Sequence, residues 1–158
     1  MYRNNISAWL LTLCLIALVP TVGIAKTNDL KASMAALKAE AEKLGAPKVQ
    51  GSDLYFGSTK ASADLVEAVA KKQGCEATLF VKNGDQYVRV ATTVKKEDGT
   101  SAVGTALDAN SPAIAKLNEG KAYHGDATIF SKTYDTGYKP IKDSSGAVIG
   151  AYFVGYAK

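Results

Sequence analysis

The stretch that decides the predicted fold is residues 77–94, ATLFVKNGDQYVRVATTV. Two apolar, β-prone runs at 78–81 and 87–94 flank Asn83-Gly84-Asp85, which is a strong signal for a tight hairpin turn. Strands joined by so short a turn run side by side in opposite directions. The stretch therefore predicts two neighbouring strands of an antiparallel sheet.

The segments on either side of this hairpin extend the pattern. Three further strands are expected at 122–130, 134–141 and 148–156, after a short helix at 110–118. Upstream, we expect helices at 28–44 and 61–73 and a strand-like stretch at 53–57. This order predicts an α+β fold, in which a long N-terminal helix packs on an antiparallel sheet of about five strands.

The helix expected at 28–44 carries a narrow apolar seam. Its members recur at spacings of three and four residues: Leu30, Met34, Leu37, Ala41 and Leu44. Such a seam suits packing on a sheet, pairing with a second copy of the chain, or both. We therefore expect the helix to cover the sheet, and a homodimer through residues 28–44 stays open.

The first 25 residues differ in composition from the rest. Residues 6–18 are almost entirely apolar, and Gly23-Ile24-Ala25 places small residues where a signal peptidase cleaves. This layout predicts a signal peptide at 1–25, a periplasmic location, and one domain at 26–158 with its sheet-bearing core at 53–157. The alternative is an inner-membrane anchor at 6–24, since a span needs roughly 20 residues.

The charge of the chain argues against a nucleic-acid partner. The net charge is +4 and the lysines are spread along 158 residues rather than clustered, so no nucleic acid is expected to bind.

The two cysteines limit covalent attachment and cross-linking. Cys14 follows Leu13 inside the apolar run, which argues against lipidation. Cys75 is the only later cysteine, so the domain has no internal disulfide. We expect Cys75 to be a buried small hydrophobe, with an intermolecular disulfide as the alternative.

The sequence lacks the motifs of catalysis. His124 is the only histidine, and no Cys, His or carboxylate cluster has metal-ligand spacing. No nucleophile motif or phosphate-binding glycine loop occurs either. We therefore predict a binding protein rather than an enzyme, without a metal or a cofactor, and an exposed or hydrogen-bonded His124.

The strand at 87–94 carries one unusual charge. Simple alternation places Val88, Val90, Thr92 and Val94 on one face, and Tyr87, Arg89, Ala91 and Thr93 on the other. Arg89 is the only arginine after residue 25, and its planar fork binds a carboxylate in a way that lysine cannot. The pattern predicts either a ligand contact or a structural ion pair with Asp135, Asp143 or Glu97.

Tyrosines gather in the later strands. Besides Tyr87, they are Tyr123, Tyr134, Tyr138, Tyr152 and Tyr156. Ligand sites have mostly apolar walls with a few polar groups, which a tyrosine-lined cleft with one arginine would match. The alternative is a set of ordinary half-buried strand tyrosines.

Several short segments, in their order, resemble the Cache sensor domains of bacterial chemoreceptors and sensor kinases. The resembling segments are residues 77–81, 87–94, 98–100, 103–108, 120–125, Tyr134, 138–143, Gly146 and Gly150. They look most like the Cache 3/Cache 2 fusion and single-Cache type 3 domains. The resemblance implies a PAS-like antiparallel sheet under a long helix, with a pocket for small organic ligands on the open face.

The resemblance also implies site residues and a function. It assigns Arg89, Tyr138 and Lys139 to the pocket or its rim, although simple alternation points Lys139 away from Tyr138. We expect an extracytoplasmic sensor domain for a carboxylate or an amino-acid-like ligand, with Tyr87, Tyr123 and Tyr134 in its walls. We expect no transmembrane helix or signalling domain after Lys158, and output through a membrane receptor or kinase partner. The alternative is an interaction module that dimerises or docks on a membrane receptor through the N-terminal helix.

Overall fold

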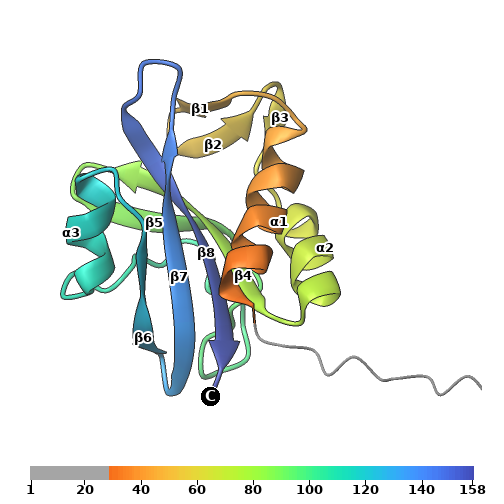
Figure 1. Ribbon diagram of the computed structural model, residues 1–158, viewed down its shortest axis with the longest axis vertical. Coiled ribbons are helices and arrows are strands. Elements are labelled where there is room, and N and C mark those ends of the chain that lie inside the picture. Colours follow the sequence, from red (N-terminus) through yellow and green to blue (C-terminus); the bar gives the residue numbers. More distant parts are fainter. Residues whose placement is uncertain (1–28) are drawn as a thin grey trace, which may run out of the picture.

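The computed structural model describes residues 29–158, and Figure 1 shows their arrangement. The first half contains α1 (Leu30–Glu42), β1 (Pro47–Gln50), β2 (Asp53–Phe56), β3 (Thr59–Lys60), α2 (Ala63–Gln73) and β4 (Glu76–Asn83). The second half contains β5 (Gln86–Thr92), α3 (Pro112–Asn118), β6 (Tyr123–Ile129), β7 (Lys132–Lys142) and β8 (Val148–Ala157). The predicted signal peptide at 1–25 and the alternative anchor at 6–24 lie outside the described residues. Within residues 29–158, no helix is long and apolar enough to cross a membrane.

The main sheet has five antiparallel strands in the order β5-β4-β8-β7-β6. The α+β prediction and the antiparallel sheet are confirmed. A second, three-stranded sheet has the order β1-β2-β3, and only the part at 53–57 was expected. Its other strands gave no signal because β1 starts at Pro47 and β3 has two residues, too few to show alternation.

The helices α1 and α2 cover one face of the main sheet, while α3 lies on the other side (Figure 1). The side chain of Asp29 caps α1 by accepting a hydrogen bond from the Ala32 N–H at 2.9 Å. Leu37 and Ala41 are fully buried in a core shared with Leu79, Tyr152 and other sheet residues. The apolar seam of α1 therefore packs on the sheet, as predicted.

A polar contact also joins α1 to the sheet. Ser33 is fully buried, and its hydroxyl lies 2.7 Å from the hydroxyl of Tyr156 on β8. Both hydroxyls lie inside the core, where a polar group without a hydrogen-bond partner is costly to bury, and each gives the other a partner. This bond joins α1 to β8 inside the core.

The predicted alternation of strand 87–94 is wrong after Arg89. Phe80 pairs with Arg89 but Leu79 pairs with Ala91, so Val90 is an extra residue in a β-bulge. The bulge turns Ala91 into the helix-side core and places Val94 in the core on the other face. Tyr87 and Arg89 precede the bulge and keep the predicted face.

We predict that Leu37→Ala lowers the free energy of unfolding by about 2–5 kcal/mol, because it opens a cavity under α1. Leu44→Ala is the matched control, since Leu44 follows the same helix but is 40% exposed. It should change stability by less than about 0.5 kcal/mol. Urea unfolding of both variants measures the difference. Equal losses would show that α1 is not held by this core.

Candidate functional site

The face of the main sheet opposite α1 holds a second core and a cavity. The core contains Phe80, Tyr87, Tyr138 and Phe153 from four different strands, and α3 packs over it. Beside it lies a cavity of about 490 Å³. Its lining is Arg89, Ala106, Leu107, Asp108, Asn110, Ser111, Pro112, Tyr123, Asp126, Ala127, Thr128, Ile129, Phe130 and Tyr138.

Arg89 lies at this cavity from the edge strand β5, and it is 4% exposed. Its Nη1 donates to the Thr105 hydroxyl and to the Ala106 carbonyl, each at 2.9 Å. Its backbone N–H donates to the Thr105 carbonyl at 2.9 Å. The connection after β5 therefore holds the guanidinium from one side and fixes its direction.

The positive charge of Arg89 has no anionic partner within residues 29–158. Asp135 pairs instead with His124 at 3.1 Å, and Asp143 accepts hydrogen bonds in its own turn, from the backbone N–H groups of Ser145 and Ala147. Glu97 makes no ion pair in the described part of the chain. The Nε atom of Arg89 is buried without a hydrogen-bond partner. The ion-pair alternative is therefore wrong, and the charge faces the cavity unpaired.

Aromatic rings surround the guanidinium. Its Cζ atom lies 5.1 Å from the centre of the Phe80 ring and 6.0 Å from that of Phe130. Such contacts stabilise a cation without neutralising it. Burial lowers the pKa of Arg89, but an arginine starts so high that it stays charged. A buried charge of this kind favours an anion in the cavity.

Tyr138 and Tyr123 form a tyrosine wall beside Arg89. Their ring centres are 6.2 Å apart, and Tyr138 is 1% exposed. The Tyr138 hydroxyl is buried without a well-formed hydrogen bond in the described residues. Burial raises the pKa of Tyr138 to about 12, while the positive charge of Arg89 acts in the opposite direction. The hydroxyl therefore stays protonated at neutral pH and can donate a hydrogen bond to a ligand.

The other three predicted site residues lie elsewhere. Tyr87 is fully buried and donates to the Asn118 side chain at 3.0 Å, so it anchors the end of α3. Tyr134 lines a separate hollow with Glu76 and other residues. Lys139 lines a hollow on the helix side of the sheet, as simple alternation from Tyr138 predicts. The cavity thus brings together Arg89, Tyr123 and Tyr138.

Two rim segments were missed by the sequence analysis. One is the segment 106–112, in which Ser111 caps α3 and Pro112 begins it; its capping signal predicted the helix but not its place over the cavity. The other is the end of β6, where Phe130 has a backbone φ of +53° and is 39% exposed. No local pattern marks Phe130, because its place over Arg89 depends on the pairing of β6 with β7.

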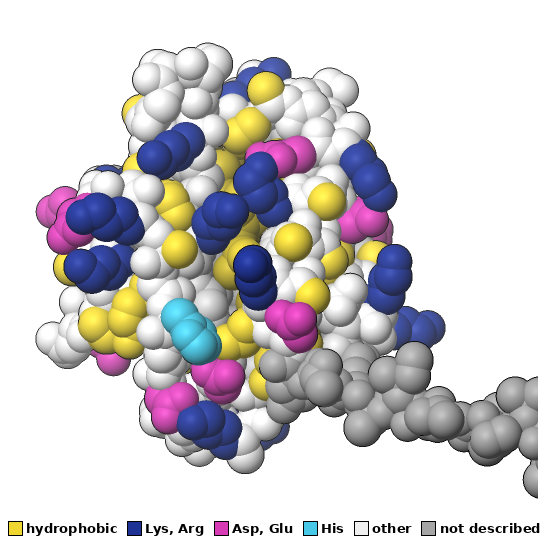
Figure 2. All heavy atoms as spheres, viewed as in Figure 1, with side chains coloured by type: hydrophobic (Ala, Val, Ile, Leu, Met, Phe, Trp, Pro, Cys, Tyr) yellow, Lys and Arg dark blue, Asp and Glu magenta, His cyan; other side chains and the backbone are white. Residues whose placement is uncertain are grey.

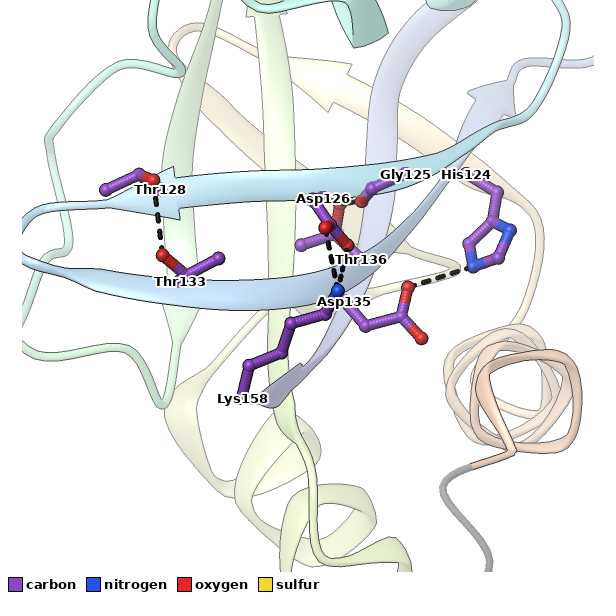
Figure 3. A network of polar contacts seen from close by, with 8 residues as sticks. All are labelled: His124, Gly125, Asp126, Thr128, Thr133, Asp135, Thr136 and Lys158. Carbon is purple, nitrogen blue, oxygen red and sulfur yellow. Dashed lines mark hydrogen bonds and ion pairs between the residues drawn. The ribbon is translucent and has the colours of Figure 1, made fainter.

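The polar contacts along β6 and β7 are shown in Figure 3. Asp126 pairs with Lys158 at 2.7 Å and His124 pairs with Asp135 on the same face of these strands, since Asp126 and Asp135 are direct cross-strand partners. His124 is exposed and hydrogen bonded, as predicted. In the part of the chain that the structure describes, no group of three or more His, Cys, Asp or Glu residues could hold a metal ion.

A helix-covered antiparallel sheet, with a cavity and a buried cation on its open face, defines a PAS-like ligand-binding domain. The chain belongs to the Cache 3/Cache 2 fusion domain family, whose profile matches residues 25–158. Cache domains are extracytoplasmic modules that sense small molecules. The family resemblance noted in the sequence is therefore confirmed.

Comparison with solved structures finds the sensor domain of E. coli DcuS, a crystal structure with 18% sequence identity and a TM-score of 0.47. That match covers 59% of this chain and 63% of the DcuS chain, so it spans less than two thirds of either. Comparison with curated proteins finds no match.

We predict that the free energy of unfolding falls as pH rises from about 10 to 12. In this window the unfolded chain has lost the Tyr138 proton, with an ordinary pKa of about 10, while the folded protein keeps it. Tyr138→Phe removes this contribution, so its stability should fall less steeply. Urea unfolding at several pH values measures both slopes. Equal slopes would mean that the hydroxyl ionises normally in the folded protein.

Proposed function

We propose that this protein is a periplasmic sensor domain that binds a small carboxylate in the cavity beside Arg89. The observation that carries the proposal is a buried guanidinium with no anionic partner in residues 29–158 and an unpaired Nε. A carboxylate would accept two parallel hydrogen bonds from the planar fork. It would also offset the cost of burying the charge.

The cavity favours a small organic ligand. Its volume of about 490 Å³ lies within the usual range of ligand sites, and its walls combine aromatic and aliphatic side chains. The hydroxyl of Tyr138, which lines the same cavity, would donate to the same anion as Arg89. Asp108 brings a carboxylate to the lining, which would suit a positively charged group. An amino acid or a related compound would use both signs of charge.

Output from this domain would need contact with another protein. We propose a membrane receptor or kinase as the partner that responds to ligand occupancy. Pairing of two copies through α1 stays a prediction, because the apolar seam of that helix is already used by the sheet. Leu44, at 40% exposed, is an uncovered part of the seam that a second protein would contact.

A thermal-shift screen of the purified protein against organic acids and amino acids tests the proposal. At 100 times its Kd, a ligand should add about 2.7 kcal/mol to the stability of the folded protein. Arg89→Lys keeps the charge but loses the fork, so it should weaken a carboxylate hit by about tenfold or more.

The matched control is Lys116→Gln, which removes a positive charge from the exposed surface of α3 on the same side of the sheet. Its affinity for the hit should be unchanged. Circular dichroism checks that each variant is folded. The absence of any carboxylate hit, or a hit unaffected by Arg89→Lys, would contradict the proposal and favour the interaction-module alternative.

A further inference from the structure

The helix side of the main sheet has a hollow of its own. It has a volume of about 350 Å³ and lies between the C-terminal half of α1 and strands β7 and β8. Figure 2 shows this side of the molecule, where Lys and Arg side chains gather over α1 and β7 around a depression with hydrophobic atoms at its base. The side chains that matter here are Lys38, Lys139, Lys142 and Tyr152, with Pro47 and Ile141 as apolar lining.

Tyr152 lines this hollow and carries a buried hydrogen-bond donor. Its ring stacks on Phe56, with centres 6.2 Å apart, and the residue is 1% exposed. Its hydroxyl is buried and has no hydrogen-bond partner within residues 29–158. Burial raises the pKa of Tyr152, and the nearby charge of Glu42 raises it further. The group is therefore a protonated donor that lacks an acceptor.

Two exposed lysines line the same hollow. Lys139 on β7 is the residue directly paired with Tyr152 on β8. Lys142, three residues on, places its Nζ 3.0 Å from where a Cβ on Gly120 would stand, so the glycine leaves room for the ammonium group. In the described part of the chain neither lysine makes an ion pair or a hydrogen bond. Lys38 differs, because it is paired with Glu42 across one turn of α1.

We propose that this hollow is a second binding site, which takes a compact phosphate-type anion through the ammonium groups of Lys139 and Lys142 and the hydroxyl of Tyr152. The choice of anion follows from the cations. Lysine acts as a point charge and suits a compact, multiply charged phosphate, whereas the planar fork that favours a carboxylate is at Arg89, on the opposite face. The charge of Glu42 is offset in part by its ion pair with Lys38.

The same chemistry has two sources, a soluble phosphate compound and the headgroup of a phospholipid. Pro47 and Ile141 would contact the part of either molecule that carries the phosphate. This site does not depend on the proposed function of the Arg89 cavity. Arg89→Lys should therefore leave phosphate binding unchanged, which separates a failure of one proposal from a failure of the other.

The test is a titration of the purified protein with inorganic phosphate at low salt, followed by the amide NMR signals of β7 and β8. The double variant Lys139→Gln/Lys142→Gln should weaken binding by about tenfold or more, since each lost contact is a hydrogen bond to a charged group. Tyr152→Phe should weaken it by roughly threefold or more for the same reason. The control Lys71→Gln/Lys72→Gln removes the same charge from exposed positions on α2 and should have little effect.

A parallel sedimentation assay uses phosphatidylcholine vesicles with and without phosphatidylglycerol. Binding to the anionic vesicles that the Lys139/Lys142 double variant loses supports the site and assigns a lipid headgroup. Phosphate binding without vesicle binding supports the site and assigns a soluble compound. Neither form of binding, an equal loss in the α2 control, or a dimer that covers the hollow and excludes phosphate would overturn the proposal.

Discussion

Burial of β8 on both faces is the constraint on which the rest of the structure depends. This strand lies between β4 and β7, and residues 150–156 are all buried. Tyr152 and Val154 face the helices, whereas Phe153 belongs to the core on the other side. Because α1 and α2 cover the first face and the smaller α3 covers only part of the second, the second face keeps a large cavity.

The two faces of the sheet keep unpaired polar groups of different kinds. On the open face a planar guanidinium and the hydroxyl of Tyr138 lie at the edge of an aromatic core. On the helix side two lysines and the hydroxyl of Tyr152 lie at the end of α1. The Arg89 Nε and the hydroxyls of Tyr138 and Tyr152 are buried without hydrogen-bond partners in residues 29–158. Such groups are costly and therefore rare, and they are the reason for proposing a ligand site on each face.

Much of the fold could be predicted because its signals are local. The Asn83-Gly84 turn, the spacing of apolar residues in α1 and the glycine after α2 each act within a few residues. Arg89 was found by alternation because it lies before the bulge at Val90. The same rule failed for Ala91 and Val94, since a bulge is set by the pairing of β5 with β4 and leaves no mark in the strand itself.

The sequence by itself determined the fold class, the family and the one arginine at the cavity, because residue order and side-chain type control turns, helix faces and charge. Only the tertiary structure decided which tyrosines share a site with Arg89, since Tyr87, Tyr134 and Tyr138 come from strand positions that alternation treats alike. Packing separates them: α3 covers Tyr87, Tyr134 lies toward a different hollow, and Tyr138 alone of the three remains beside the unpaired charge. The physical reason is that a cavity is what long-range packing leaves unfilled, and no short segment of sequence specifies it.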